Sequence, residues 1–418
     1  MELLINQVGY ECDGEKSALL QCGADLDIRG HVRLLRQQDD HLLLETPLVA
    51  AGCVPGWQGR HYWRADFSAF TEPGHYRLEA VVTTGAQERL VRSPSFAIGR
   101  GLLARRCLSD VIHYFKGQRA SGTFDRADRR ARLFGTDQRR DVHGGWFDAS
   151  GDMSKYLSHL SYANYLNPQQ TPMVVWSLLK CRELLATRRD IDGMNLCKRL
   201  NDEGLHGADF LCRMQDESGF FYMTLFDKWS KDPEQRELCA YATQQGIKSA
   251  RWQAGFRQGG GMTIAALARA AREPSGGDLD TSQYADAARR GYLHLREHNL
   301  AYLDDGVENI IDDYCALLAA VELTRTLGAE WLAEARDRAG RLCARQRAHP
   351  DLGHHWAAND DGSRPYYHAA EAGLPVLALL EYLSVEPDPA RQWAARTVAE
   401  QALAAELALC ARAGNPFV

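Results

Sequence analysis

The chain has 418 residues, of which 45% are hydrophobic and 25% are charged, and its formal net charge is −6 at pH 7. This length and apolar content suit a soluble protein of two to three domains, each with a full core. A mildly acidic surface attracts neither nucleic acid nor an anionic membrane, which excludes both as the main partner.

The N-terminus and the cysteines bear on the cellular compartment. Residues 1–7 lack the basic and apolar regions of a signal peptide, and no apolar run approaches the roughly 18 residues that span a bilayer. The eleven cysteines include no C-x-x-C pair and mostly sit within apolar patterns. We therefore expect a cytoplasmic protein with reduced thiols, without a zinc site or another cofactor.

The first part of the chain, residues 1–98, has the pattern of short strands. Apolar residues tend to alternate in runs such as 16–22, 61–67 and 75–82, and turn residues such as Glu72-Pro73-Gly74 separate the runs. About seven strands at this spacing predict a small β-sandwich.

The remainder, residues 99–418, changes to helical spacing of apolar residues. The predicted helices span 102–115, 171–186, 196–214, 260–271, 282–297, 310–327, 330–346, 369–383 and 389–411. No clear strand separates these roughly nine helices, and no repeating unit indicates a solenoid. Long loops rich in Trp, Tyr, His, Asp and Gly join the helices, which is typical of a binding face. We therefore expect an α/α toroid with its functional groups at one end.

The strongest motif runs from Asp141 to Tyr156 and reads DVHGGWFDASGDMSKY. Asp148 and Asp152 straddle a Ser-Gly turn, so their carboxylates can converge on one water and act as a general base. The alternative is that both aspartates only cap turns, as aspartate often does.

This motif resembles the signature of glycoside hydrolase family 9, the inverting cellulases and related exo-acting enzymes. The extra residue between the two aspartates, and the opening Ile5-Asn6-Gln7-Val8-Gly9-Tyr10, resemble a subgroup with an N-terminal immunoglobulin-like domain. That subgroup includes exo-β-glucosaminidases and cellodextrin-trimming enzymes. The resemblance implies an immunoglobulin-like sandwich followed by an (α/α)6 toroid. It also implies that Asp148 and Asp152 position and deprotonate the attacking water, with Asp152 favoured as the base.

Further polar and aromatic residues are candidates for substrate contacts, because a sugar offers an apolar face for stacking and hydroxyls for hydrogen bonds. They are Trp146, Trp229, Trp252, Arg257, Asp312, Asp313, His354, His355 and Tyr367. The alternatives are structural: tryptophans at helix ends often fill the core, and the two acids suit the start of a helix. Adjacent histidines without further spaced ligands seldom bind a metal.

Inverting hydrolysis also needs a proton donor across the scissile bond. The family resemblance implies a glutamate near the C-terminus in a Trp-Gln-Gly-Glu-Asn-like segment, and this sequence has none. The number of predicted helices also falls short of a closed (α/α)6 toroid. We therefore expect an incomplete toroid, from a truncated chain or a partial record, or else a divergent enzyme that uses Glu371. Partial burial near a helix start would raise the pKa of Glu371, although a first-turn glutamate can equally serve the helix dipole.

The predicted function is exo-acting hydrolysis of short β-1,4-linked oligosaccharides, either chitosan oligosaccharides or cellodextrins. Asp312, Asp313 or Glu371 could form an acidic pocket for an amino sugar. The alternatives are a carbohydrate-binding protein of the same fold without catalysis and a helical scaffold for protein partners, which the aromatic loops disfavour. An open toroid would expose apolar helix faces, which predicts a homodimer or poor solubility.

Overall fold

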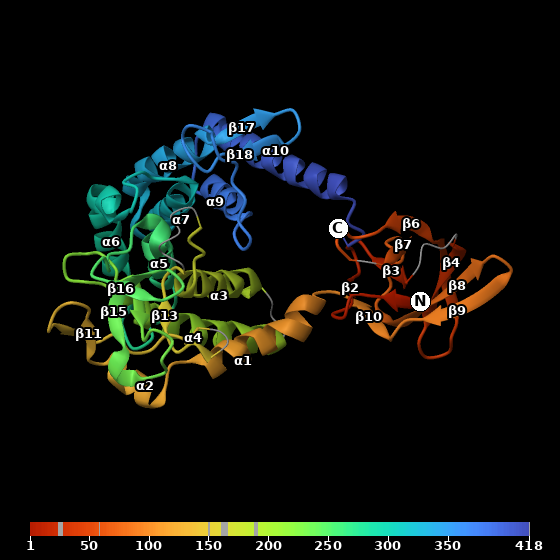
Figure 1. The fold of residues 1–418 in the computed structure, drawn as a ribbon, viewed down its shortest axis with the longest axis horizontal. Helices are drawn as coiled ribbons and strands as arrows, with labels where there is room; N and C mark the ends of the chain where they lie inside the picture. The colour runs from red at the N-terminus through yellow and green to blue at the C-terminus, as the bar shows by residue number, and fades with distance from the viewer. Residues whose placement is uncertain (24–27, 58, 149–150, 160–165, 188–190, 418) are drawn as a thin grey trace. The chain divides into compact units, whose positions relative to one another are not determined.

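The structure is a computed structural model that describes residues 1–23, 28–57, 59–148, 151–159, 166–187 and 191–417. It divides into two compact units, one of Met1–Val111 with Glu406–Val418 and one of Ile112–Ala405. Figure 1 labels their helices and strands. The predicted boundary between residues 98 and 99 stays a prediction.

The first unit contains two β-sheets. One sheet has the order β1 (Glu2–Leu4), β3 (Ser17–Cys22), β7 (His61–Asp66), β6 (Val49–Gly52). The other has the order β2 (Tyr10–Glu11), β10 (Phe96–Gly99), β8 (Gly74–Thr84), β4 (Ile28–Arg36), β5 (Leu42–Pro47), with β9 (Gln87–Arg92) also paired to β8. Inward-facing residues of both sheets, such as Leu20, Val32 and Leu78, form one buried core. The count of about seven strands was too low, because two-residue and three-residue strands show no alternation.

The last residues of the chain also belong to the first unit. The Arg64 guanidinium donates a hydrogen bond of 2.5 Å to the Pro416 carbonyl. The Phe417 ring lies edge-on to Tyr62, with 5.1 Å between the ring centroids. These contacts join residues 416–417 to strand β7, which carries Tyr62 and Arg64.

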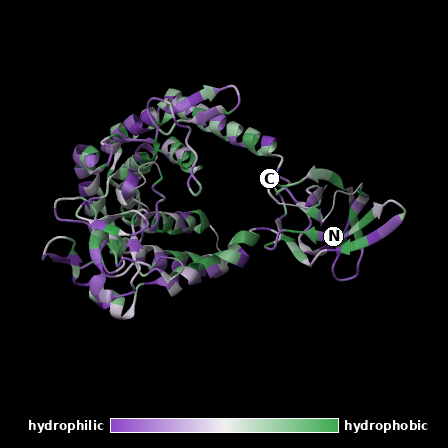
Figure 2. Cartoon of the chain, in the orientation of Figure 1, coloured by the Kyte–Doolittle hydropathy of each residue, from purple (hydrophilic) through white to green (hydrophobic). Residues whose placement is uncertain are grey.

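The second unit is mainly helical. Its helices, with α1 and α10 crossing the unit boundary, are α1 (Ser109–Gln118), α2 (Gly122–Asp128), α3 (Thr171–Leu185), α4 (Ile191–Arg213), α5 (Gly261–Ala270), α6 (Thr281–Tyr302), α7 (Ile310–Leu327), α8 (Leu332–Ala344), α9 (Leu374–Leu383) and α10 (Pro389–Ala413). Helix α3 packs on α4, α5 on α6 and α7 on α8, while α3, α5, α7 and α9 pack side by side in that order. This is the arrangement of inner and outer helices that a ring of hairpins requires. Helix α5 is buried along its whole length. Figure 2 shows hydrophobic and hydrophilic residues interspersed along the helices of this unit.

The expectation of helices without intervening strands was wrong. Six short strands from the loops form one sheet: β11 (Ala131–Leu133), β12 (Arg139–Arg140), β13 (Lys155–Tyr156), β14 (Thr224–Phe226), β15 (Glu237–Ala242) and β16 (Ile247–Ser249). A hairpin of β17 (Gln346–His349) and β18 (Gly353–Trp356) follows α8. Strands of two to six residues are too short for alternation to stand out from a loop. This sheet places the end of the Asp141–Tyr156 motif against β14.

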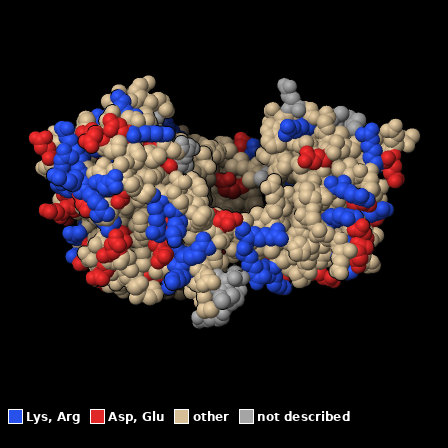
Figure 3. All heavy atoms as spheres, turned by 90° about the horizontal axis from the view of Figure 1, so that it is seen from below, with Lys and Arg blue, Asp and Glu red and all other residues tan. Residues whose placement is uncertain are grey.

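The described residues also bear on membrane insertion, cysteine oxidation and surface charge. None of their helices combines the length and the apolar character needed to cross a membrane. All eleven cysteines are free thiols. Figure 3 shows basic and acidic side chains interspersed on the face in view. The predicted incompleteness of the toroid and the predicted homodimer stay predictions.

Candidate active site

Buried charged groups hold the loop that leads from β12 to β13. The Lys155 ammonium donates hydrogen bonds to the carbonyls of Gly144, at 2.6 Å, and Val142, at 3.2 Å. It also forms a fully buried ion pair with Asp128 at 2.7 Å. Burial lowers the pKa of Lys155 to about 8, against the opposing effect of Asp128. A buried cation satisfied in this way fixes the backbone that begins the motif.

The Gly-Gly-Trp part of the motif is tightly packed. Gly145 has a φ of +70°, and a Cβ atom there would lie 2.7 Å from the Phe210 ring, so only glycine fits. The Trp146 indole donates to Glu203 at 2.7 Å, and Arg119 forms an ion pair with the same carboxylate at 2.8 Å. The indole nitrogen of Trp146 is therefore held by Glu203, which leaves only the carbon atoms of the ring for other contacts.

Ser154 binds both aspartates. We call Asp148 together with residues 151–154 the base turn, and residues 149–150 lie outside the described residues. The Asp148 amide donates to the Ser154 carbonyl at 3.1 Å, and the Ser154 amide donates to Asp152 Oδ1 at 2.9 Å. The Tyr156 hydroxyl donates to Asp152 Oδ2 at 2.7 Å. Both aspartates are half-buried, so their carboxylates keep access to solvent.

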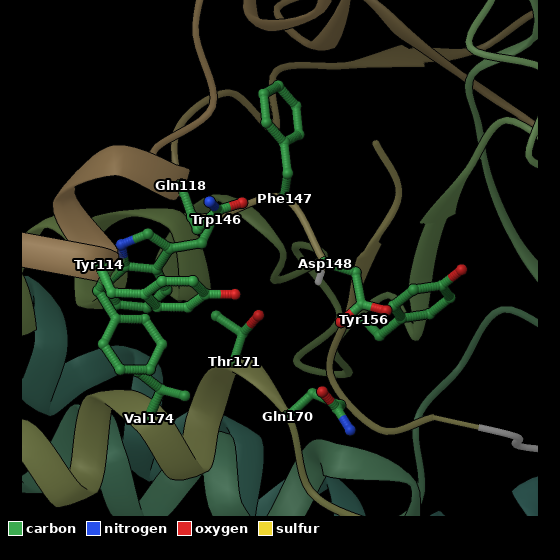
Figure 4. Close-up of a pocket in the computed structure, with 10 residues that line it drawn as sticks. Tyr114, Gln118, Trp146, Phe147, Asp148, Tyr156, Gln170, Thr171 and Val174 are labelled. Carbon is green, nitrogen blue, oxygen red and sulfur yellow. The ribbon is translucent and has the colours of Figure 1, made fainter. Parts of the chain in front are cut away.

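Asp148 and Tyr156 line a cavity of about 220 Å³, shown in Figure 4. The other lining residues come from α1, the motif and the start of α3: Tyr114, Phe115, Gln118, Trp146, Phe147, Gln170, Thr171 and Val174. Burial, reinforced by the hydrogen bond to Asp152, raises the pKa of Tyr156 far above its usual value, so this phenol stays a proton donor. The cavity thus combines aromatic rings with a carboxylate and an amide, which is the composition that a sugar ring requires.

A second aromatic surface lies on β14 and β15. Trp229 is 41% exposed, and its ring packs edge-on against Phe226, with 4.9 Å between centroids. Tyr241 stacks on Phe226 at 4.5 Å and also contacts Trp229 at 5.9 Å. We call Trp229, Phe226 and Tyr241 the aromatic platform. An exposed indole supported by two buried rings can stack on the apolar face of a sugar.

Comparison with known proteins identifies both parts of the chain. Residues 1–84 match the cellulase N-terminal ig-like domain, and residues 105–405 match glycosyl hydrolase family 9. The chain belongs to glycosyl hydrolase family 9. It is therefore an O-glycosyl hydrolase of the cellulase-like kind, with an immunoglobulin-like domain before a helical family 9 domain. The predicted fold class is thereby confirmed, whereas the predicted subgroup stays a prediction. No curated protein matches the chain.

Solved family 9 structures share the fold. "Bacteroides ovatus GH9" is 19% identical, with a TM-score of 0.63, and the match covers 99% of this chain and 74% of that one. A metagenome-derived family 9 endoglucanase is 21% identical, with a TM-score of 0.55 and coverage of 97% and 84%. The family 9 endoglucanase J30 is 18% identical, with a TM-score of 0.58 and coverage of 93% and 70%.

Three predicted site residues are buried in ion pairs. Asp312 is fully buried and pairs with Arg257 at 3.1 Å, while Arg257 also reaches Asp305 at 2.7 Å. Asp313 is fully buried and pairs with Arg345 at 2.5 Å. Burial raises the pKa of Asp312 to about 6, although Arg257 opposes this shift. These side chains expose no surface to a substrate in this structure.

Glu371 is 6% exposed, and its two oxygens accept hydrogen bonds from the Gln169 amide and from the Tyr314 hydroxyl, the latter at 2.6 Å. Burial raises its pKa. It adjoins the cavity only through the backbone of residue 169, next to the lining residue Gln170.

The remaining predicted contacts do not line the cavity. Trp252 is half-buried and its carbonyl accepts from the Met223 amide at 2.7 Å. His354 is exposed on β18, His355 beside it is half-buried, and Tyr367 is 52% exposed. Among the described residues, no group of three His, Cys, Asp or Glu side chains could hold a metal ion.

Sequence reasoning gave no role to Tyr156, Ser154 or Glu203, which hold the site. Ser154 and Tyr156 lie two and four residues after Asp152 in the motif, so their polar side chains close to the aspartate were a usable signal. Glu203 gave none, because it lies 57 residues from Trp146 on helix α4.

Proposed function

We propose that this family 9 chain hydrolyses short β-1,4-linked oligosaccharides with inversion at the anomeric carbon. In this mechanism Asp148 and Asp152 hold a water and Asp152 takes its proton, while the water oxygen attacks the anomeric carbon. The departing oxygen takes a proton from an acid on the other side of the sugar. The observation that carries this proposal is that Ser154 binds both half-buried aspartates, through the amide of Asp148 and through Oδ1 of Asp152, and that Asp148 lines an aromatic cavity.

Neutral cellodextrins fit the described residues better than chitosan oligosaccharides. An ammonium group requires exposed carboxylates, and the three acids predicted for that role, Asp312, Asp313 and Glu371, are all buried. The experiment compares the kcat/KM for cello-oligosaccharides with that for chitosan oligosaccharides of equal length. Faster turnover of the chitosan series would contradict the preference for neutral sugars, and turnover of neither would contradict the hydrolase mechanism.

The structure gives less support for the identity of the proton donor than for that of the general base. Burial favours the protonated form of Glu371, as a donor requires, whereas the hydrogen bonds to both of its oxygens restrain the side chain. The catalytic role of Glu371 therefore stays a prediction, tested below with a substrate whose leaving group needs no proton. The predicted cytoplasmic location also stays a prediction.

The second candidate is a carbohydrate-binding protein that lacks catalysis, favoured by the engaged oxygens of Glu371. Calorimetry with cellotetraose separates the two functions when it is combined with a hydrolysis assay. The hydrolase binds and turns over the sugar, whereas the binding protein binds it and leaves it intact.

A further inference from the structure

The base turn and the aromatic platform share one buried carboxylate. Asp227 is fully buried, and its Oδ1 accepts hydrogen bonds from the Ser154 hydroxyl, at 3.1 Å, and from the Trp229 amide, at 3.0 Å. Its Oδ2 accepts from the Lys231 amide at 3.1 Å. Since Ser154 also closes the base turn, two hydrogen bonds connect that turn to the residue that carries the exposed indole.

The loop that presents this indole has an unusual backbone. Lys228, Trp229 and Lys231 have φ angles of +59°, +57° and +56°, in the left-handed region that residues other than glycine seldom occupy. Such conformations persist only where the surroundings impose them, and they concentrate at functional sites. The two amides that bind Asp227 belong to this loop, so the carboxylate is the group that imposes its shape.

A neighbouring turn also packs closely against the indole. A Cβ atom on Gly246, in the turn between β15 and β16, would lie 2.9 Å from the Trp229 ring. With Phe226 and Tyr241 beneath it, the ring has little freedom to move relative to the sheet. The loop that carries this ring is bound to Asp227, which also binds Ser154.

We infer that Asp227 is a positioning residue that couples sugar stacking on Trp229 to the geometry of the two catalytic aspartates. A sugar unit on the platform then increases kcat instead of only lowering KM, because binding energy from a remote part of the substrate orients the reacting groups. This inference rests on the proposed function, since it concerns the turnover that Asp148 and Asp152 perform.

The hydroxyl of Ser154 is the part of this connection that can be removed with the least disturbance. Ser154→Ala keeps the amide that binds Asp152 and the carbonyl that binds Asp148, and it deletes the hydroxyl that binds Asp227 and also contacts the Tyr156 side chain. Asp227→Asn is the second variant. Its amide nitrogen would face the Lys231 amide, so one accepted hydrogen bond becomes a clash of two donors.

The experiment measures kcat and KM for cellobiose to cellopentaose. For the wild-type protein we expect kcat to rise about tenfold along this series, which corresponds to about 1.4 kcal/mol of transition-state stabilisation. For Ser154→Ala we expect KM to stay within about twofold at each length while the rise in kcat disappears. Asp227→Asn should lose the same rise.

A double-mutant cycle tests the coupling directly, because Ser154 and Trp229 make no contact with each other and are linked through Asp227. Trp229→Ala should raise KM and also abolish the rise in kcat. Ser154→Ala should then lower kcat no further in the Trp229→Ala background. The control is Ser230→Ala, which deletes a hydroxyl of the same loop that donates to the Asp227 carbonyl at 2.7 Å and accepts from the Asp232 amide at 3.2 Å, away from the Asp227 carboxylate. In the Ser230→Ala variant kcat should still rise from cellobiose to cellopentaose.

Two results would overturn the coupling while leaving the hydrolase mechanism intact. One is a wild-type kcat that does not change with chain length, and the other is a Ser154→Ala variant that loses the same factor at every length. Multiplicative effects of Ser154→Ala and Trp229→Ala on kcat would also count against it. If the wild-type protein binds every oligosaccharide in calorimetry and hydrolyses none, the proposed function fails, and the coupling fails with it.

Discussion

Two pairs of aspartates in the helical unit have opposite surroundings. Asp148 and Asp152 are both half-buried, and Asp148 lines a cavity. The oxygens of Asp152 accept from neutral donors, the Ser154 amide and the Tyr156 hydroxyl. Asp312 and Asp313 are fully buried opposite arginines. A carboxylate held by neutral donors can still accept a proton from water. One committed to a buried arginine holds the fold instead, and removing it leaves an uncompensated charge.

The comparison therefore assigns chemistry to the first pair and stability to the second. Each pair precedes or begins a regular element, since Asp152 lies before β13 and Asp312 lies in the first turn of α7. Position along the chain therefore does not distinguish the catalytic candidates from the structural aspartates. Their hydrogen-bonding and ion-pair partners distinguish them, and substitution of single carboxylates tests this difference.

The largest expected effect is that of Asp152→Asn on turnover. Asparagine can still accept from the Ser154 amide, but it cannot take a proton from water, so kcat for cello-oligosaccharides should fall by about 10² to 10⁴. Thermal unfolding should change little. The matched control is Asp141→Asn in the same loop, where the carboxylate binds His143 outside the base turn. Full activity of Asp152→Asn would remove the chemical role from the first pair.

Glu371→Gln tests whether a third acid belongs with the first pair. If Glu371 protonates the leaving oxygen, the variant should lose about 10² to 10⁴ in kcat on cello-oligosaccharides. It should lose little on a dinitrophenyl glycoside, whose leaving group departs without a proton. Glutamine can keep the bonds to the Gln169 amide and the Tyr314 hydroxyl, so folding should be preserved. Equal losses on both substrates would place Glu371 with the structural acids.

Asp312→Ala should act on stability alone. Removing this carboxylate leaves Arg257 buried with less than its full counter-charge, which typically costs about 3 to 5 kcal/mol. Urea unfolding measures the loss, and kcat per folded molecule should be unchanged. The control is Asp305→Ala, whose half-exposed carboxylate contacts the same guanidinium and should cost less than about 1 kcal/mol. A folded Asp312→Ala variant with reduced kcat would break the division between the pairs.

The existence of the long helices was the most predictable part of this fold, although α2 was not predicted and limits of α1, α4, α6 and α9 differ from the predicted ones by five or more residues. The helix expected at 310–327 is observed as α7 with the same limits, because a segment rich in apolar residues lies between the Asn309 cap and Gly328. The motif that carries Asp148 and Asp152 was equally accessible because its residues are consecutive, whereas the convergence of the two carboxylates stays a prediction. Local sequence decides both features.

The partners of the buried acids were not predictable from one sequence. Arg257 and Asp312 are 55 residues apart, and nothing near either residue marks the pairing. The same holds for Asp227 and Ser154, which are 73 residues apart and come together only because β13 pairs with β14. A sequence identifies groups able to do chemistry, whereas the tertiary fold decides which of them are neutralised.

The smallest expected effect is a pH dependence of stability that belongs to the second pair. Burial raises the pKa of Asp312 to about 6, although Arg257 opposes it, and an aspartate in an unfolded chain titrates near about 3.9. Between these values the folded protein binds more protons at this position than the unfolded chain does. The contribution of Asp312 to the free energy of unfolding is therefore full below about pH 4 and is lost as the pH rises through about 6.

Asp312→Asn removes this titration, so the wild-type free energy of unfolding minus that of the variant should fall between pH 4 and 6, by at most about 1.4 kcal/mol per pH unit. Chemical denaturation at pH 4, 5, 6 and 7 measures it. Glu386→Gln is the control of opposite sign, because the hydrogen bond from Arg336 lowers the pKa of Glu386 to about 2. Its difference from the wild type should be constant above about pH 4.5 and shrink only at lower pH. A constant difference for Asp312→Asn would mean that Arg257 keeps this aspartate charged throughout, and the second pair would then be a permanent ion pair without a buried titration.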